Sequence, residues 1–319
     1  MNFQKQITNE NNLTIVTEFF LKGFQMRKSL RMFLFCLLLV VYCGTICGNL
    51  LIIVLVSTSR NLHTPMYFFI SQLSVSDILV ITDVVPNLLH ILLNNGGVVI
   101  SIACISQLYF FGASEAFECF LLTVMSYDRY VAICNPLHYS TIMTSRHCVK
   151  VSILCWMLGY SIILIFIIRT ANVIFCGPNI IDHLFCDIVP LLELACSDTF
   201  VIHLGIYFMG ILVVIIPTTI IVTSYTNIVL AVLRIPTSTG RQKAFSTCSS
   251  HLIVVSIFYW TIFSVYIVPT KGQSSTISKI LSLFYTVFTP LVNPIIYSLR
   301  NKDINKAIQE TIHKCNSFY

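Results

Sequence analysis

The sequence predicts an all-α membrane protein, a seven-transmembrane helix bundle followed by a short amphipathic C-terminal helix. The first observation is composition: 56% of the 319 residues are hydrophobic and only 10% are charged, against about 25% charged residues in soluble domains. The second is length, because seven apolar segments each reach the roughly 20 residues that a span requires. The third is that the basic residues lie in short loops between these segments, so the net charge of +6 does not indicate a nucleic-acid partner.

The seven apolar segments should be helices, because lipid offers no hydrogen-bond partner to an unpaired backbone group. We treat residues 1–319 as a single seven-span membrane domain, with a polar tail at 1–28 and a second tail at 300–319. The first tail has no apolar stretch of the signal-peptide kind, so we expect the first span to direct its own insertion. The predicted spans are 30–57, 66–93, 101–133, 149–169, 200–233, 244–268 and 276–299.

Lysine and arginine set the expected orientation in the membrane. One set of loops holds most of these residues, and an odd number of spans puts the two termini on opposite faces. We therefore expect a multi-pass protein of the plasma membrane, with tail 1–28 extracellular and tail 300–319 cytoplasmic. The chain's one Asn-x-Ser/Thr sequon, at Asn12, agrees with glycosylation of an outer tail.

The first span is nearly all apolar, whereas the second and third carry acidic residues. Asp77 lies within 66–93, and Glu115 and Glu118 lie within 101–133. A carboxylate inside a membrane persists only where it faces the bundle interior and finds a partner or a proton. The third span ends in Asp128-Arg129-Tyr130, a charged triplet that indicates a paired or functional site at the inner face.

The fourth span, 149–169, is apolar between Lys150 and Arg169, and prolines mark the later spans. Pro217 in the fifth span and Pro290 and Pro294 in the seventh each remove a backbone hydrogen bond, which predicts kinked helices. After the seventh span, Ile304, Ala307, Ile308 and Ile312 recur at helical spacing among lysines. This pattern predicts a short amphipathic helix on the inner leaflet, in which Cys315 is either palmitoylated or an ordinary free thiol.

The 13 cysteines divide by their predicted location. Those within spans should be small buried hydrophobic residues, and those on the inner side should be reduced. Four lie on the outer side, and spacing cannot choose among their three possible pairings. A metal site there is the weaker alternative, because no Cys-x-x-Cys pair exists and only one histidine is near. The span cysteines are Cys36, Cys43, Cys47, Cys119, Cys155 and Cys248; the outer ones are Cys104, Cys176, Cys186 and Cys196.

Six sequence strings, in order along almost the whole chain, resemble the odorant-receptor branch of the rhodopsin-like (class A) G-protein-coupled receptors. Small departures are Ser126 where alanine is commonest and Val292 where leucine is usual. A lone Asp-Arg-Tyr would be a weak signal, but six ordered strings are specific. They are Gly48-Asn49, Leu62–Tyr67, Met125–Cys134, Ser224-Tyr225, Lys243–His251 and Pro290–Asn301.

The resemblance implies two disulfides, Cys104–Cys186 and Cys176–Cys196, and an activation switch at the inner face. In this mechanism Asp128 holds Arg129 until the inner end of the sixth span opens. The resemblance also implies a buried ion or water cluster at Asn49, Asp77 and Glu118, and sodium is the candidate ion. The switch residues are Asp128, Arg129, Tyr130, Tyr225, Lys243, Asn293, Pro294 and Tyr297.

The same resemblance implies a ligand cavity in the outer half of the third, fifth, sixth and seventh spans. Glu115 either lines this cavity and favours donor or cationic ligands, or shares the water cluster with Glu118; the sequence leaves both readings open. The implied function is an odorant receptor that activates a stimulatory, olfactory-type heterotrimeric G protein and raises cyclic AMP. The expected cavity residues are Phe111, Gly112, Glu115, Ala116, Met209, Tyr259, Ile262, Phe263 and Tyr266.

Other functional classes fit the sequence less well. We find no phosphate-binding glycine loop, zinc-protease motif or nucleophile elbow, so we expect no enzyme and no resident cofactor or metal beyond the candidate sodium ion. A transporter or channel would also place acids in the membrane, but no inverted repeat is visible. A receptor-like scaffold that does not signal remains a further alternative.

Overall fold

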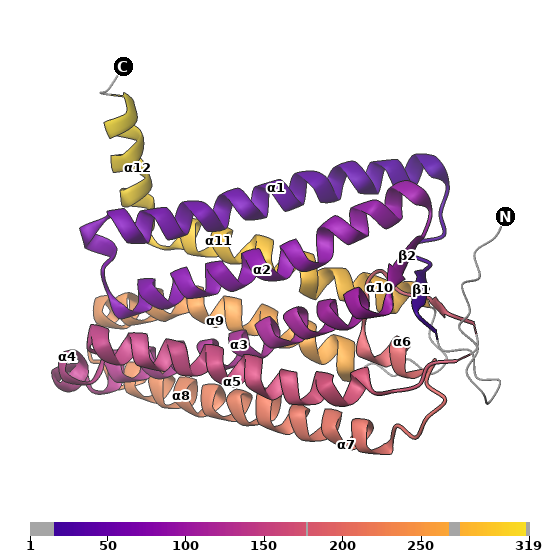
Figure 1. Cartoon of the computed structure of the whole chain (residues 1–319). Coiled ribbons are helices and arrows are strands. Elements are labelled where there is room, and N and C mark those ends of the chain that lie inside the picture. Colours follow the sequence, from indigo (N-terminus) through magenta and orange to yellow (C-terminus); the bar gives the residue numbers. More distant parts are fainter. Residues whose placement is uncertain (1–15, 177, 268–274, 317–319) are drawn as a thin grey trace.

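The computed structural model describes residues 16–176, 178–267 and 275–316, and seven long helical segments run side by side along the molecule (Figure 1). Asn12 lies outside the described residues, so its modification stays a prediction. The segments are α1 (Lys28–Thr58), α2 (Pro65–Asn94), α3 (Ser101–Cys134), α5 (Ser145–Ala171), α7 with α8 (Phe200–Met209, Ile216–Leu233), α9 (Ser238–Ile267), and α10 with α11 (Ser275–Leu283, Thr289–Arg300).

The prediction of an all-α bundle with seven helical segments is confirmed, although the boundaries differ. Among the described residues, six segments are long and apolar enough to cross a membrane, and α9 carries a shorter apolar stretch, Cys248–Ser264. The fourth helix begins at Ser145, four residues before the predicted span. Thr144 explains this difference, because its side chain accepts a hydrogen bond from the His147 amide at 3.3 Å and caps the helix before its apolar part.

Two of the helical segments contain a π-helical turn shortly before a proline. One turn spans Gly210–Ile215 and precedes Pro217, and the other spans Phe284–Phe288 and precedes Pro290. Proline donates no backbone hydrogen bond, so the carbonyls one turn earlier lose their regular partners. A widened turn lets the remaining amides find new partners without ending the helix, and such turns often mark functional places.

A small sheet lies at one end of the bundle, and the sequence did not predict it. β1 (Glu18–Leu21) pairs antiparallel with β2 (Gly97–Ile100) and parallel with β3 (Ile180–Ile181). Phe19 and Leu21 of β1 are fully buried. The tail 1–28, expected to be simply polar, therefore contains a strand that pairs with strands from two loops predicted to be extracellular, and the short helix α6 (Ile188–Leu192) lies beside it. We call this end of the bundle the outer end, and the opposite end the inner end, after the predicted orientation.

The opposite end carries the inner loops and the C-terminal helix α12 (Lys302–Asn316), which turns away from the bundle (Figure 1). Ile304 and Ala307 of α12 are buried, while Lys306 is exposed, as an amphipathic helix requires. The side chain of Cys315 lies outside the described residues. Shorter turns complete this end: Arg60–Leu62, Pro136–His138 and α4 (Tyr139–Ile142).

The expectation that the span cysteines are buried is wrong for three of them. Cys36, Cys43 and Cys47 are exposed on α1, whereas Cys119, Cys155 and Cys248 are buried. A cysteine is small and apolar enough to face lipid without cost, so composition alone cannot tell which side of a helix it occupies.

Candidate functional site

An ion pair at the inner end of α3 is the first part of the candidate site. Arg129 donates to Asp128 Oδ2 through Nε at 2.8 Å and also through Nη2, and both residues are buried. The Tyr139 hydroxyl donates to the other carboxylate oxygen, Asp128 Oδ1, at 2.9 Å. Burial raises the pKa of Tyr139 above its ordinary value, and the Asp128 charge raises it further, so this hydroxyl keeps its proton and remains a donor.

Tyr139 had no role in the sequence-based site, although it lies only five residues after the Met125–Cys134 string. It lies beyond the α3 helix, in the short helix α4, and only folding of the loop brings its hydroxyl back to Asp128. The signal was present in the sequence as a tyrosine near the triplet, but spacing alone did not reveal the contact.

The second part lies between α8 and α9, where Tyr225 meets His251. The Tyr225 hydroxyl is 2.5 Å from His251 Nδ1, and the two rings stack with 20° between their planes. His251 is fully buried, and the sequence analysis gave it no role beyond its string. Tyr225 is therefore bonded to α9 and not to Arg129 in this arrangement.

The remaining predicted switch residues are spread around this inner region. Tyr297 is buried on α11, and its hydroxyl has no hydrogen-bond partner among the described residues. Tyr130 is half-buried and packs near Tyr127, with ring centroids 6.3 Å apart. The backbone of Lys243 is part of α9, but its side chain lies outside the described residues.

The third part is a polar cluster in the middle of the bundle. Asn293 Nδ2 donates to both oxygens of Asp77, at 3.0 and 3.1 Å, and joins α11 to α2. Asn49 Nδ2 donates to the carbonyl of Pro290 at 3.2 Å. That carbonyl needs a donor from elsewhere, because its regular partner would be the backbone N–H that Pro294 lacks. The sequence thus pairs a helix-breaking proline with an asparagine on a neighbouring helix.

Two oxygens of this cluster are left over. Glu118 Oε1 and Asn49 Oδ1 are buried and have no hydrogen-bond partner among the described residues. Asp77, Glu115 and Glu118 also lie close enough to repel one another when charged. Carboxylate and amide oxygens suit a hard cation or water, so the donor chemistry fits sodium, although both Asp77 oxygens already accept from Asn293. The described residues contain no group of three or more histidine, cysteine or acidic side chains arranged to hold a metal ion.

The outer end carries a loop that is fastened at several points. Disulfides join Cys104 to Cys186 and Cys176 to Cys196, with Cα–Cα distances of 5.3 and 5.9 Å. The first ties the loop to the top of α3, and the second closes a smaller loop within it.

Lys279 of α10 holds the same loop and the N-terminal segment together. Its ammonium group donates to Asp182 Oδ1 at 2.6 Å and to the carbonyl of Gly23 at 2.8 Å, and the residue is only 4% exposed. His183 is next to this ion pair, 3.1 Å from the Ser282 hydroxyl. Burial lowers the pKa of His183, and the Lys279 charge lowers it further against the opposing effect of Asp187. The sequence analysis gave Lys279 no role in these contacts.

The expected ligand-cavity residues lie in different surroundings. Phe111 lies under the outer loop, with ring centroids 5.7 Å from Phe185 and 5.3 Å from Tyr285. Gly112 faces α5, since a Cβ there would lie 3.5 Å from Ile163. The core contains Ala116, Tyr259 and Ile262, and Met209 and Phe263 pack against it. Glu115 is half-buried. The side chain of Tyr266 lies outside the described residues.

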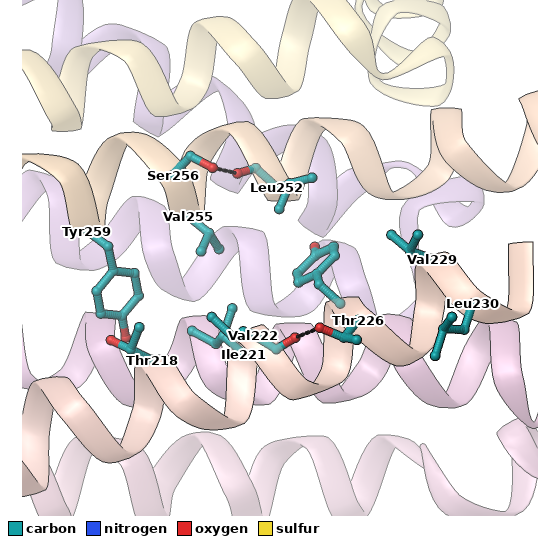
Figure 2. A pocket seen from close by; sticks show the side chains of 11 residues that line it. Thr218, Ile221, Val222, Thr226, Val229, Leu230, Leu252, Val255, Ser256 and Tyr259 are labelled. Carbon is teal, nitrogen blue, oxygen red and sulfur yellow. Dashed lines mark hydrogen bonds between the residues drawn. The ribbon is translucent and has the colours of Figure 1, made fainter. Parts of the chain in front are cut away.

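A cavity of about 470 Å³ lies between α8 and α9 (Figure 2). Of the expected ligand residues with described side chains, Tyr259 alone lines it. Its other lining residues lie between Thr218 and Leu230 of α8, including Tyr225, and between Leu252 and Ser256 of α9.

Comparison with known proteins identifies the family. A family profile described as olfactory receptor matches residues 35–314. Olfactory receptor 1500 of Rattus norvegicus is 45% identical over 303 residues, which cover 95% of this chain and 97% of the relative. Olfactory receptor 10A7 of Homo sapiens is 44% identical (94% and 95% covered), and olfactory receptor 5G9 of Mus musculus is 42% identical (97% and 98%). The chain therefore belongs to the olfactory receptor family, a family of multi-pass membrane G-protein-coupled receptors and not of enzymes.

Proposed function

We propose that this chain is an odorant receptor that activates a stimulatory, olfactory-type heterotrimeric G protein and so raises cyclic AMP. The observation that carries the proposal is the buried Asp128–Arg129 pair at one end of α3, in a chain of this family. A buried ion pair contributes little net stability. Its presence is therefore better explained by switching than by holding the bundle together.

The proposed switch exchanges one set of polar contacts for another. In the arrangement described here Arg129 is held by Asp128, and Tyr225 is held by His251. Opening of the inner end of α9 separates Tyr225 from His251 and uncovers Arg129. The hydroxyls of Tyr225 and Tyr297 then accept hydrogen bonds from Arg129, while Tyr130 and Lys243 border the G-protein cleft and Pro294 lets α11 bend. Because bonds are exchanged, a few kcal/mol of differential ligand binding shifts the populations.

The proposed odorant site lies in the outer half of the bundle, below the disulfide-fastened loop. Phe111, Ala116, Ile262 and Phe263 supply apolar surface, and Glu115 supplies the one acidic group. Burial of each ligand methylene contributes about 0.8 kcal/mol, so a mostly apolar odorant reaches micromolar affinity with few hydrogen bonds. The ligand is small and apolar because polar anchors are few.

The proposed orientation places the disulfide-bearing end outside the cell and α12 in the cytoplasm, in the plasma membrane. Disulfides persist in oxidising compartments, and the β1 strand and α12 lie at opposite ends of the bundle (Figure 1). The inner end also carries more lysine and arginine, as the positive-inside rule requires. Loss of a glycan from Asn12→Gln, seen as a gel shift, tests the outer placement of the N-terminus.

A sodium ion is proposed at the polar cluster in the resting state. Asp77 and Glu118 would hold it, with the free Asn49 oxygen nearby, and the ion would neutralise part of the acidic charge of the cluster. Sodium-dependent odorant affinity in the wild type, absent from Asp77→Asn, supports this proposal; equal affinity in sodium and in choline buffers refutes it.

The deciding experiment measures odorant-dependent nucleotide exchange on a stimulatory G protein with receptor-containing membranes. Arg129→Ala should abolish exchange, while surface delivery and odorant binding persist. The reason is that the Asp128–Arg129 ion pair lies far from the proposed odorant site. Arg146→Ala is the matched control, since it removes an exposed charge at the same end of the bundle. Exchange that survives Arg129→Ala would reject the switch, and ion flux without exchange would favour a transporter.

Glu115→Gln separates the two roles left open for that acid. If Glu115 contacts ligand, the variant loses responses to basic or donor odorants selectively and keeps the others. Glu118→Gln is the control, because Glu118 lies one turn further in and belongs to the polar cluster. An unchanged odorant profile for Glu115→Gln would contradict the ligand contact and assign Glu115 to the polar cluster with Glu118.

A further inference from the structure

We propose that Tyr67 is the residue that positions α12, and that the direction it gives α12 sets how well the inner end of the receptor binds its G protein. The second half of this proposal rests on the proposed function. Tyr67 ends the string Leu62–Tyr67, and Asn301 ends the string Pro290–Asn301. Neither of these two residues has a role in the switch, and the structure brings them together.

The Tyr67 hydroxyl faces two acceptor oxygens at the junction between α11 and α12. It lies 2.9 Å from Asn301 Oδ1 and 2.8 Å from Asp303 Oδ2. A hydroxyl has one hydrogen, so Tyr67 donates to one of these oxygens at a time. Asp303 lies in the first turn of α12, and a carboxylate is a stronger acceptor than an amide. The bond to Asp303 therefore ties α12 itself to α2.

Asn301 is already occupied as the cap of α12. Its Oδ1 accepts from the backbone amide of Asp303 at 3.0 Å and from that of Ile304 at 3.4 Å. Asparagine is among the preferred residues at the start of a helix because its side chain accepts from such amides. An amide oxygen has two lone pairs, and these two bonds use both. The Asp303 carboxylate is thus left as the acceptor for Tyr67.

The start of α2 holds Tyr67 in place. Thr64 has an extended backbone, with φ −118° and ψ 159°, and Pro65 follows in the first turn of α2. A proline there fixes φ and begins the helix at a defined residue. Tyr67 is buried in the same core as Leu62 and Met66. Its hydroxyl therefore presents a fixed donor to α12.

Burial alone does not give α12 one direction. Ile304 and Ala307 lie in this same core, and α12 leaves the bundle at the end where α2 begins (Figure 1). Hydrophobic contact is non-directional, so it allows α12 to rotate and tilt over the core. A hydrogen bond is directional. The bond between Tyr67 and Asp303 therefore selects one tilt.

The direction of α12 matters at the inner end because α12 continues from α11. Helix α11 carries Asn293, Pro294 and Tyr297 of the proposed switch. The surface of α12 is the next one that a protein docking at this end contacts. Only receptors whose α12 points in the required direction bind the G protein, so a loss of that population weakens binding in proportion.

The first test measures the direction of α12 without using signalling. Spin labels are introduced as unnatural amino acids at Lys150 and Gln309, which are both exposed, and their separation is measured in the full-length receptor in nanodiscs. Tyr67→Phe keeps the ring and its packing, and should broaden or shift the narrow distance distribution of the wild type. Tyr127→Phe, an exposed tyrosine at the same end, should match the wild type. An unchanged distribution in Tyr67→Phe overturns the positioning role, whether or not the receptor signals.

The second test measures G-protein-dependent nucleotide exchange. Tyr67→Phe should raise the G-protein concentration for half-maximal exchange severalfold, and leave the odorant affinity measured without G protein unchanged. Asp303→Asn keeps an acceptor oxygen and should have a smaller effect. That effect should shrink in the Tyr67→Phe background, because the two residues act through one bond. Glu310→Gln is the matched control: it removes an exposed acid of α12 that lies 3.9 Å from Lys306, and should behave like the wild type.

The outcomes separate the parts of the proposal. A changed distance distribution with unchanged G-protein dependence overturns the link to coupling. Equal effects of Asp303→Asn in the wild-type and Tyr67→Phe backgrounds overturn the bond between the two residues. Absence of exchange in the wild type rejects the proposed function, and the link to coupling with it, while the distance measurement still decides the role of Tyr67.

Discussion

Two side chains at the inner end of the bundle, Arg129 and Tyr139, bind the carboxylate of Asp128. Asp128 uses one carboxylate oxygen for Arg129 and the other for Tyr139, so both of its oxygens are occupied. Tyr139 is not charged and does not touch Arg129 in any described contact. Its contribution is to hold the carboxylate in the orientation in which the ion pair forms.

Tyr139→Phe should therefore raise odorant-independent nucleotide exchange, by roughly tenfold or more, because a hydrogen bond to a charged group contributes about 1.5–3 kcal/mol. The ring and its packing remain, so the effect isolates the hydroxyl. The measurement is basal exchange on the stimulatory G protein at matched receptor density. Tyr127→Phe serves as control, since Tyr127 is exposed at the same end. Basal exchange that is unchanged in Tyr139→Phe contradicts the role given to this bond.

Helices α3 and α5 approach each other closely at Gly159. A Cβ added to Gly159 would lie 2.8 Å from the backbone nitrogen of Phe117 and 3.0 Å from the carbonyl oxygen of Ala113. Beside this contact the rings of Phe117 and Trp156 stack, with centroids 3.8 Å apart. Backbone atoms cannot yield as a flexible side chain can, so only glycine fits here.

Gly159→Ala should destabilise the receptor by about 1–3 kcal/mol, the usual cost of overpacking a well-filled core. Thermal unfolding of detergent-purified receptor, or the yield of folded protein at the cell surface, measures this effect. Gly44→Ala is a matched substitution on α1, where nothing lies within 4 Å of the added Cβ, and it should be neutral or slightly stabilising. Equal melting temperatures for the two variants would show that α3 and α5 separate without cost.

At the scale of the whole molecule, the two ends of the bundle are built differently. The outer end is fastened by two disulfides, a sheet of three strands from three separate segments, and the Lys279 contacts with Asp182 and Gly23. The inner end depends on exchangeable polar contacts. A rigid outer end and an exchangeable inner end suit a molecule that senses at one end and moves at the other.

The stability of the outer end should depend on pH through His183. Its pKa is lowered in the folded state, chiefly by burial, and the nearby charges of Lys279, Asp187 and Asp182 act on it in opposing directions. Below its ordinary pKa of about 6.5 the unfolded chain binds a proton that the folded chain does not. Folding stability is then fully present above about pH 6.5 and falls as the pH decreases, by at most about 1.4 kcal/mol per pH unit.

Melting temperatures of the purified receptor between pH 7.5 and 5.5 check this expectation. His183→Asn removes the titrating group and should flatten the dependence, although it also lowers stability at neutral pH by weakening the contact with Ser282. A melting temperature that rises toward pH 5.5 in the wild type, or an equally steep fall in His183→Asn, would contradict the assignment.

The sequence by itself determined the class of the molecule, because apolar length and the placement of charges fix which segments can cross lipid. It also supplied the strings around Asn49, Asp128 and Pro290 that indicated the family. Tertiary structure decided the contacts that depend on chain reversal: Tyr139 at Asp128, His251 at Tyr225, and Lys279 between the N-terminal segment and the outer loop. Hydropathy and spacing describe one segment at a time, whereas a hydrogen bond between segments depends on how helices rotate and pack. That rotation also left the cavity between α8 and α9 open and turned the α1 cysteines outward.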